Sequence, residues 1–296
     1  MKILLFGKNG QVGWELQRAL APLGELVALD ANSAPWHADF ADPEALAATV
    51  RAVAPTWIVN AAAHTAVDKA ESEPDLARAI NATAPAVLAR EARAIGATLL
   101  HYSTDYVFDG GGTAPWVEDA ATGPLSVYGA TKLAGEEAIR HSGCTHLILR
   151  TSWVYAARGG NFVKTMLKLA QEREALKVIA DQIGAPTGAE LLADVSAHAL
   201  RQITHQPQLS GTYHVAAAGQ TSWHGYAQHV IEHARAAGLP IRVAPHAIEA
   251  VPTSAFPTPA QRPRNSRLDT RKLQTSFGLQ LPAWQVGVDR LLAEIL

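Results

Sequence analysis

The start of the chain constrains the fold more than any other part. Lys2–Phe6 is a short apolar run of the kind that forms a strand buried in a parallel sheet, and Gly7, Gly10 and Gly13 follow it directly. Glycines at such a turn let a dinucleotide pyrophosphate approach the backbone at the start of a helix. Their spacing differs by one residue from the usual fingerprint, but the helix expected over Val12–Leu20 completes the strand, turn and helix that the motif requires.

Strands and helices alternate after this turn. Further strands are expected over Glu25–Leu29, Trp57–Asn60, Thr98–Tyr102 and His146–Thr151. Helices are expected between them over Pro43–Val53, Pro74–Ala94 and Tyr128–His141. Strands that alternate with helices in this way pair in parallel and carry helices on both faces. The sequence therefore predicts an α/β fold with a doubly wound parallel sheet, the Rossmann fold.

The alternation loosens beyond about Arg173. The elements expected there are helices over Ala189–Ile203, Trp223–Ala237 and Trp284–Leu296, a strand over Thr212–Ala216, and a proline-rich stretch over Val251–Pro263 that cannot be helical. We expect a dinucleotide-binding domain formed by residues 1–172 and about 211–237. A smaller α/β substrate-binding domain would be built from the C-terminal segments at about 173–210 and 238–296.

Composition excludes several classes of protein. The 296 residues are 48% hydrophobic and 18% charged, which is typical of a globular protein. The 25 Lys and Arg residues nearly balance the 27 Asp and Glu residues, so the overall charge gives no basis for a nucleic-acid partner or an anionic membrane surface. No apolar run reaches the roughly 20 residues of a membrane span, and Ile3–Phe6 is too short for a signal peptide. A lone Cys144 cannot form an intrachain disulfide. We expect a cytoplasmic protein.

Two strand ends carry polar residues that could contact a ligand. Asp30 closes the second strand, where a carboxylate can accept hydrogen bonds from the adenosine ribose, although it could also be an ordinary turn residue. An acid there favours NADH, whereas Lys8 in the glycine turn would soften the repulsion of a 2'-phosphate. Thr104 and Asp105 follow the fourth strand, at the edge of the sheet where ligands bind in such folds.

Tyr128 and Lys132 lie one helical turn apart on the same face. An ammonium about 4 Å from the phenol, at an effective dielectric near 20, would favour the phenolate by roughly 4 kcal/mol. The pKa of Tyr128 would then fall by ~3 from its reference near 10, close to the pH at which acid-base transfer is most efficient. Burial of the phenol would act in the opposite direction. Such a pair also occurs by chance on many helices.

Arginines cluster near the C-terminus. Arg262, Arg264 and Arg267 surround Asn265 and Ser266, after the proline-rich stretch. Planar guanidinium groups suit pyrophosphate recognition, although a solvated basic loop would have the same composition.

Taken together, these residues resemble the extended short-chain dehydrogenase/reductases. Longer runs narrow the resemblance to the branch that reduces a dTDP-linked 4-keto sugar in bacterial rhamnose biosynthesis. These runs are NAAAHTAVDKAE (60–71), STDYVFDG (103–110), YGATKLAGE (128–136), RTSWVY (150–155), DQIGAPTGAELLAD (181–194) and RPRNSRLDT (262–270).

This resemblance implies a role for each matching residue. Tyr128 would donate a proton to the C4 oxygen of the substrate, Thr104 would hydrogen-bond the same oxygen, and Lys132 would bind the nicotinamide ribose and tune the phenol. The other cofactor contacts would be Gly7, Gly10, Gln11, Val12, Gly13, Asp30, Asp39, Phe40, Ala62, Ala63, His64 and Tyr102. Asp105 and Trp153 would contact the sugar.

Some members of this branch are homodimers with Mg²⁺ at the subunit contact, and the glutamates that hold the ion would correspond to Glu190 and Glu294 here. Because Mg²⁺ prefers octahedral oxygen ligation and keeps much of its water, two carboxylates alone are a weak signature. Such an ion would be structural and would take no part in the reaction.

The reaction that the resemblance implies is reduction of the C4 ketone by NADPH or NADH, which gives dTDP-β-L-rhamnose. Two alternatives share the fold. A nucleotide-sugar epimerase or dehydratase would recycle a tightly bound NAD, and a non-catalytic regulatory subunit would bind NADP and dock onto an enzyme.

Overall fold

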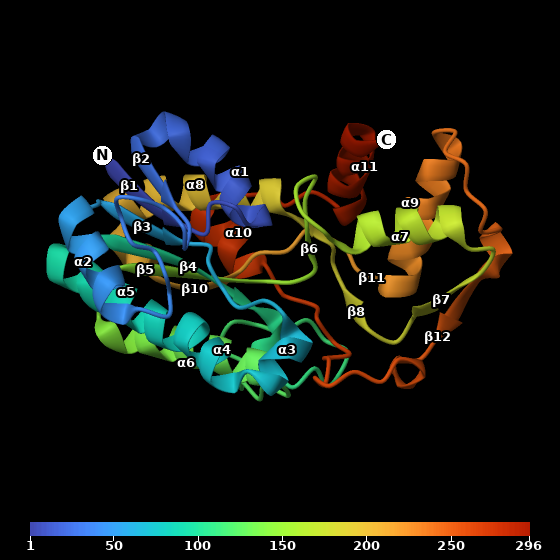
Figure 1. Ribbon diagram of the computed structural model, residues 1–296, viewed down its shortest axis with the longest axis horizontal. Coiled ribbons are helices and arrows are strands. Elements are labelled where there is room, and N and C mark those ends of the chain that lie inside the picture. The colour runs from blue at the N-terminus through green and yellow to red at the C-terminus, as the bar shows by residue number, and fades with distance from the viewer.

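A six-stranded sheet forms the centre of one lobe in the computed structural model, which describes residues 1–296 (Figure 1). Every pair of neighbouring strands is parallel, and the order is β10-β5-β4-β3-β1-β2. The strands are β1 Lys2–Phe6, β2 Glu25–Leu29, β3 Trp57–Asn60, β4 Thr98–Thr104, β5 His146–Thr151 and β10 Gly211–His214. The chain passes from β1 to β2 at one edge and then returns to β3 on the other side of β1. The doubly wound parallel sheet predicted from the sequence is confirmed.

Helices cover both faces of this sheet because successive residues of a strand point to opposite sides. Ile3 and Leu5 pack in one hydrophobic cluster with α1, α8 and α10, whereas Leu4 and Phe6 pack in another with α2, α5 and α6. The bounds of these helices are α1 Gln11–Leu20, α8 Ala189–His205, α10 Arg271–Phe277, α2 Pro43–Val53, α5 Ala84–Ile95 and α6 Val127–Ser142.

The turn after β1 depends on two of its glycines. Gly7 has a φ of +85°, and a Cβ there would lie 2.7 Å from the backbone of Ala61 and of Ala62. A Cβ on Gly13 would lie 2.0 Å from the carbonyl oxygen of Gly7. A side chain at Gly7 would push the turn away from the loop after β3, and one at Gly13 would push α1 away from the turn. The close packing of this turn, called the glycine cradle below, therefore depends on glycine at these two positions.

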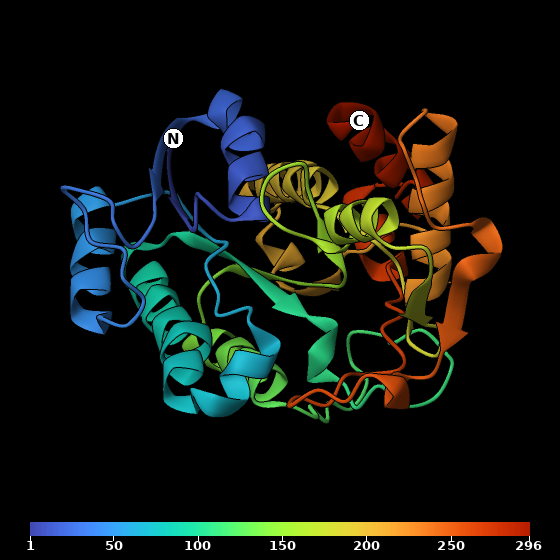
Figure 2. The same cartoon turned by 45° about the vertical axis from the view of Figure 1, so that its right-hand side comes forward.

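The second lobe has a hydrophobic core of its own. Its helices are α7 Phe162–Glu172, α9 Trp223–Ala236 and α11 Trp284–Ile295, which pack with the parallel pair β7 Leu176–Ile179 and β12 Ile248–Val251. Figure 2 shows this lobe turned toward the viewer, beside the sheet lobe. Short pairs lie between the lobes and consist of β6 Val154–Tyr155 with β9 Thr187–Gly188, and β8 Ile183–Gly184 with β11 Thr221–Ser222.

The hydrophobic clusters group α7, α8, α9 and α10 differently from the domain bounds expected from the sequence. As expected, residues 211–214 join the main sheet. However, α9 packs with α7 and α11 in the second lobe, although residues up to about 237 were assigned to the dinucleotide-binding domain. Conversely, α8 packs against α1 on the sheet lobe. An amphipathic helix shows from its sequence that it has an apolar face but not which partner will cover it, so the domain bounds stay a prediction, and the packing assigns these helices to the lobes differently.

The helical segment predicted over Pro74–Ala94 is confirmed, but a π-helical turn interrupts its regular α-helical geometry. The short helix α3 Val67–Ser72 precedes this segment, which consists of α4 Pro74–Arg78, the π-helical turn η2 Ala79–Thr83, and α5. In the π turn, the fully buried amide of Asn81 donates to the carbonyl oxygen of His64 and accepts from its backbone N–H. This turn therefore gives up regular helical geometry and ties the helix to the loop that follows β3.

The proline-rich stretch is extended, as expected, apart from a single 3₁₀ turn. It runs from the second lobe back beneath the sheet lobe and leads into α10 (Figure 1). The short 3₁₀ helices of the chain are η1 Ala21–Leu23, η3 Asp105–Val107, η4 Pro207–Leu209, η5 Pro245–Ala247 and η6 Thr253–Ala255. None of the helices is both long enough and apolar enough to cross a lipid bilayer.

Candidate active site

A cavity of about 690 Å³ opens at the carboxyl ends of the central strands, next to the point where the strand order reverses. Most of the residues singled out from the sequence line it. They are Gly7, Gly10, Gln11, Val12, Asp30, Asp39, Phe40, Ala62, Ala63, Tyr102, Thr104, Asp105, Tyr128, Lys132 and Trp153. The glycine cradle thus lies in the same cavity as the phenol and the hydroxyl that were expected to act on the substrate.

Gly13 and His64 do not line this cavity. Gly13 instead leaves room for the carbonyl of Gly7, as described above. The side chain of His64 is 8% exposed, and its Nε2 lies 3.8 Å from a carboxylate oxygen of Glu73. Asn81 holds the backbone of His64 on both sides, and nothing in the sequence distinguished Asn81 from its helical neighbours.

Asp30 organises the end of the cavity nearest β2. Its Oδ1 accepts from the backbone N–H of Asn32 at 3.0 Å and from the hydroxyl of Ser33 at 2.9 Å, and Asn9 donates to its other oxygen. The Nζ of Lys8 donates to the same Ser33 hydroxyl at 2.9 Å. A carboxylate and an ammonium therefore meet at one serine, so neither sign of charge dominates this end.

Thr104 and Asp105 are held rigidly at the end of β4. The Oγ1 of Thr104 accepts from the N–H of Tyr106 at 3.2 Å and so caps the start of η3. The same hydroxyl donates to Asp105 Oδ1 at 3.1 Å. Burial raises the pKa of Asp105 to about 6, against the lowering effect of the nearby Ser266 hydroxyl and of the hydrogen bond from Thr104. The second oxygen of Asp105 is buried without a partner in the chain, so it is free to accept from a ligand.

Tyr128 is the second residue of α6, whose first turn is capped by the Ser126 hydroxyl. Burial raises the pKa of Tyr128 above its ordinary value. Hydrogen bonding with Thr104 opposes this, and the charge of Asp105 adds to it. The lowered pKa predicted from the spacing of Tyr128 and Lys132 is therefore wrong for the free protein. The Coulomb estimate left out the loss of water around the phenolate, which outweighs the other effects here.

Lys132 contributes little to the phenol because its amine is engaged elsewhere. Its Nζ donates to the carbonyl oxygen of Tyr102 at 2.6 Å and lies 3.2 Å from Nε2 of His101. Burial lowers the pKa of Lys132 to about 8, partly opposed by Glu136. This amine therefore gains and loses its proton near physiological pH.

An ion pair beneath α6 fixes this helix to the sheet. Arg150 of β5 donates to both carboxylate oxygens of Glu136, at 2.9 and 2.6 Å, and both side chains are at most 2% exposed. Burial acts to raise the pKa of Glu136, but the hydrogen bonds and charge of Arg150 bring it below its usual value. Tyr128 and Lys132 lie on this same helix, so the pair sets the position of both.

A second cavity, of about 640 Å³, adjoins the first and shares Tyr106, Trp153 and Trp223 with it. Its lining is largely apolar and comes mainly from the second lobe. Of the three arginines noted in the sequence, only Arg262 lines it, together with Ser266, and Arg262 also pairs with Asp68 at 2.7 Å. Arg264 and Arg267 do not line it.

Trp223 was not identified from the sequence. Its indole stacks on that of Trp153, and its Nε1–H donates to Gln182 at 3.0 Å. Because it is the first residue of an amphipathic helix, its sequence position is equally typical of a core residue.

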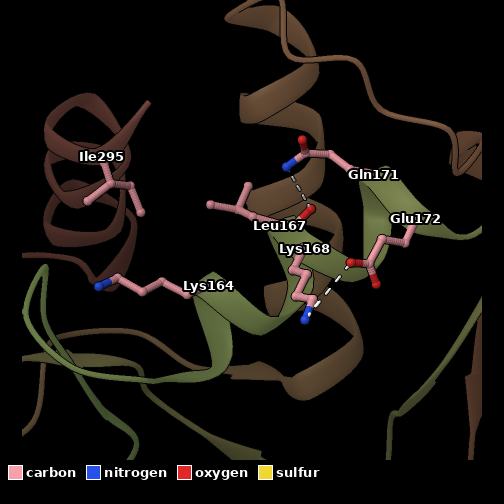
Figure 3. A pocket seen from close by; sticks show the side chains of 6 residues that line it. All are labelled: Lys164, Leu167, Lys168, Gln171, Glu172 and Ile295. Carbon is pink, nitrogen blue, oxygen red and sulfur yellow. Dashed lines mark hydrogen bonds and ion pairs between the residues drawn. The ribbon is translucent and has the colours of Figure 1, made fainter.

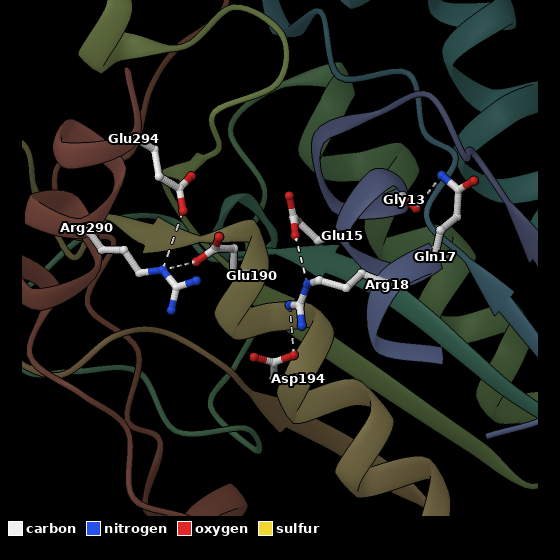
Figure 4. Close-up of polar contacts among 8 residues, drawn as sticks. All are labelled: Gly13, Glu15, Gln17, Arg18, Glu190, Asp194, Arg290 and Glu294. Carbon is white, nitrogen blue, oxygen red and sulfur yellow. Dashed lines mark hydrogen bonds and ion pairs between the residues drawn. The ribbon is translucent and has the colours of Figure 1, made fainter. Parts of the chain in front are cut away.

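The two glutamates expected to hold Mg²⁺ converge on an arginine of the same chain (Figure 4). Nε of Arg290 lies 3.3 Å from Glu190 and 3.6 Å from Glu294. No group of three or more His, Cys, Asp or Glu side chains is placed to hold a metal ion. A guanidinium already supplies the positive charge between these carboxylates, so the residues do not fit the expected magnesium site.

Another hollow, of about 550 Å³, lies between α7 and α11, away from the predicted site residues (Figure 3). Its lining includes Leu167 and Ile295, beside the ion pair of Lys168 with Glu172. None of the residues predicted to bind the cofactor or the substrate lines this hollow.

Comparison with known proteins agrees with this geometry. A family model described as the RmlD substrate binding domain matches residues 1–296. The dTDP-4-dehydrorhamnose reductase of Escherichia coli strain K12 is 60% identical over 295 residues, which cover 100% of this chain and 98% of that protein.

Solved structures give the same result. A dTDP-4-dehydrorhamnose reductase from Clostridium acetobutylicum has a TM-score of 0.90 and 35% identity, covering 100% of this chain and 99% of the other. The dTDP-4-dehydrorhamnose reductase from Bacillus anthracis, solved in complex with NADP, has a TM-score of 0.88 and 35% identity, covering 99% of each chain.

Proposed function

Since the chain belongs to the dTDP-4-dehydrorhamnose reductase family, we propose that it catalyses reduction of the C4 ketone of dTDP-4-dehydro-β-L-rhamnose to dTDP-β-L-rhamnose by NADPH or NADH. The observation that carries the proposal is a shared cavity. Tyr128 and Thr104 line the same cavity as the glycine cradle, and this cavity adjoins a second one of a size suited to a nucleotide sugar.

The residues of the first cavity fit a dinucleotide. A Cβ on Gly7 or Gly13 would fill the cradle, which suits close approach of a pyrophosphate to the backbone. Asp30 offers a carboxylate to ribose hydroxyls, while Lys8 and Ser33 offer donors to a 2'-phosphate. The relative from Bacillus anthracis binds NADP. We therefore expect both cofactors to bind, and when bound the cofactor would supply the hydride.

The second cavity supports a nucleotide-sugar substrate. The indoles of Trp153 and Trp223 lie at the junction of the two cavities, and Phe256 lines the second. Aromatic faces of this kind suit a nucleobase or a sugar ring. Arg262 offers a cation to the diphosphate at the same wall. In this proposal the second lobe, with α7, α9 and α11, forms the substrate-binding unit.

The residues around the phenol suit protonation of an oxygen. Because burial raises its pKa, Tyr128 keeps its proton at neutral pH and is available as the acid for the C4 oxygen. Thr104 hydrogen-bonds with Tyr128, and its hydroxyl hydrogen would turn from Asp105 Oδ1 to the same C4 oxygen. The unpartnered Asp105 oxygen would accept a hydrogen bond from a sugar hydroxyl and so orient the ring.

A coupled assay tests this function. Purified protein is mixed with NADPH or NADH, with and without the dTDP-ketosugar, and absorbance of the reduced cofactor is followed. Stoichiometric oxidation only when the ketosugar is present supports the proposal. Conversion of a nucleotide sugar without net oxidation would support an epimerase or dehydratase instead. Cofactor binding with no turnover of any dTDP- or UDP-ketosugar would favour the regulatory subunit.

The homodimer and the cytoplasmic location stay predictions, as do the domain bounds and the roles of the individual site residues. Sedimentation of the purified chain at several concentrations would test the first.

A further inference from the structure

Three buried side chains form a hydrogen-bonded chain behind the active site. Asn60 ends β3, His101 lies opposite it on β4, and Lys132 comes from α6. Nδ2 of Asn60 lies 2.9 Å from Nδ1 of His101, and Nε2 of His101 lies 3.2 Å from Nζ of Lys132. All three residues are at most 2% exposed, so no water competes for these contacts. The proposed function gives no role to Asn60 or His101.

The hydrogen bond between Asn60 and the backbone of Ala62 determines which atom donates in each of the other two contacts. Oδ1 of Asn60 accepts from the backbone N–H of Ala62 at 3.0 Å. A peptide N–H can only donate, so this contact fixes which end of the amide is oxygen. The other end is an NH₂ group, which must donate to Nδ1 of His101. That nitrogen therefore carries a lone pair, and the hydrogen of the neutral imidazole sits on Nε2.

This arrangement determines the state of Lys132. The Nε2–H of His101 points at Nζ, so Nζ must supply a lone pair, which an ammonium lacks. A neutral amine satisfies every contact, because it donates to the Tyr102 carbonyl and accepts from His101. When Lys132 is charged, the donor and the acceptor must exchange roles at both contacts of His101. Nε2 must then accept, the hydrogen moves to Nδ1, and the Asn60 amide must rotate to present its oxygen to His101.

Rotation of Asn60 has a consequence in the cofactor cavity. The backbone N–H of Ala62 would lose its acceptor, and Ala62 lines that cavity. The Ala61 and Ala62 backbone cannot retreat toward Gly7, because even a Cβ there would lie 2.7 Å away. The freed N–H therefore stays at the cavity wall.

We propose that His101 is a positioning residue that couples the protonation of Lys132 to the backbone of Ala62 in the cofactor cavity. One proton is taken up from solvent by the site as Lys132 becomes an ammonium, and the single hydrogen of His101 is relocated from Nε2 to Nδ1. Asn60 then rotates and releases the Ala62 N–H. The proposal rests on the proposed function only in giving Lys132 a place beside the cofactor.

The surroundings keep the imidazole neutral throughout this change. Burial, with the charge of Lys132, lowers the pKa of His101 well below its usual value. Of the charged groups nearby, Glu136 of α6 favours the ammonium form of Lys132, but it is already paired with Arg150 of β5. The neighbouring polar groups from η2 and α6, Asn81 and Thr131, are uncharged and bonded to each other. Among Asn60, His101 and Lys132, Lys132 is therefore the group that titrates.

Nuclear magnetic resonance tests the coupling without substrate. Protein labelled with ¹⁵N-histidine and ¹³Cε-lysine is titrated from well below to well above the Lys132 pKa of about 8. We expect His101 to change from the Nδ1–H to the Nε2–H tautomer with the same midpoint as Lys132. In Lys132→Met, which has no amine, His101 should keep the Nε2–H tautomer at every pH. A His101 tautomer that does not change while Lys132 titrates would overturn the proposal.

Two variants test the effect on the proposed reaction. His101→Leu removes the hydrogen bonds that link Asn60 to Lys132, so the Lys132 amine loses one of its two contacts. We expect kcat to fall by up to about 10²-fold, as it does when a catalytic group is misplaced. His101→Gln keeps a donor and an acceptor and should restore most of the turnover, with the limb of the pH profile that belongs to Lys132 moved. Equal loss in both variants with an unchanged pH profile would show that His101 serves only packing. An enzyme with no reductase activity would leave the tautomer result standing, so the two failures are distinguishable.

Discussion

The indole rings of Trp153 and Trp223 stack with centroids 3.7 Å apart and planes inclined by 16°. Trp153 follows β5 in the sheet lobe and Trp223 begins α9 in the second lobe, so this pair joins the lobes where the two cavities meet. Trp153 has a φ of +51°, a backbone conformation that costs energy for a bulky residue. Tertiary packing therefore holds this indole in place against its local preference.

Loss of one of these rings should weaken substrate binding more than turnover. Trp223→Ala removes a wall shared by both cavities, and a lost stacking contact with a base or sugar is worth roughly 1–3 kcal/mol. We expect KM for the dTDP-ketosugar to rise about tenfold or more, with a smaller change in kcat. Trp223→Phe keeps an aromatic face, so its KM should lie between those of the wild-type protein and Trp223→Ala. Steady-state kinetics at saturating NADPH measures this, and an unchanged KM would remove Trp223 from the substrate site.

Removal of the Tyr128 hydroxyl should abolish most of the chemistry. Tyr128→Phe leaves the ring in place and takes away the acid, which is worth on the order of 10²–10⁴ in kcat. Binding of NADPH, followed by its fluorescence, should persist. Tyr213→Phe is a suitable control, because its hydroxyl donates to Leu209 at the far edge of the sheet. Full turnover in Tyr128→Phe would sink the role assigned to this phenol.

Asp105 should make the protein less stable as pH rises. Its folded pKa of about 6 lies above the ordinary value of 3.8, so the folded state binds more protons between these values. Stability is therefore highest below the ordinary pKa and decreases as pH rises through about 6. Asp105→Asn removes this cost and should raise the free energy of unfolding at neutral pH by roughly 3 kcal/mol, with little gain in acid. Urea unfolding at pH 4 and pH 8 measures the difference.

The same substitution should reduce activity, because the unpartnered oxygen of Asp105 is the group proposed to orient the sugar. For the wild-type protein, kcat/KM should fall as pH drops below about 6, where this carboxylate takes up a proton. A gain in stability with full activity would separate Asp105 from the substrate.

The ion pair beneath α6 should be costly to break. Glu136→Gln leaves the guanidinium of Arg150 buried without a counter-charge, which typically costs about 3–5 kcal/mol. Arg140 also contacts Glu136, at 3.1 Å, but its side chain is 38% exposed. Arg140→Gln is thus a matched control and should cost less than about 1 kcal/mol. Urea unfolding of the two variants at neutral pH compares them, and equal losses would contradict this account of the pair.

Local pattern was sufficient for most of the sheet lobe. The strands over Lys2–Phe6, Glu25–Leu29, Trp57–Asn60 and His146–Thr151 have the predicted bounds, as does the helix over Pro43–Val53. These segments have an apolar pattern that only one element type satisfies. The smaller sheets, in the second lobe and between the lobes, have strands of two to four residues that do not stand out from their surroundings as apolar runs.

The sequence by itself determined most of the residues that line the cavity, because in a parallel sheet the residues after each strand meet at one edge. This rule predicted that the glycine turn, Thr104 and Asp105 lie together, and helical spacing with the family resemblance added Tyr128 and Lys132. Only the tertiary structure decided their protonation. Burial and hydrogen-bond direction depend on what packs around a group, and they leave Tyr128 with a raised pKa and turn the amine of Lys132 toward His101. Helical spacing predicts that two side chains are neighbours, but the surrounding protein determines which of them holds a proton.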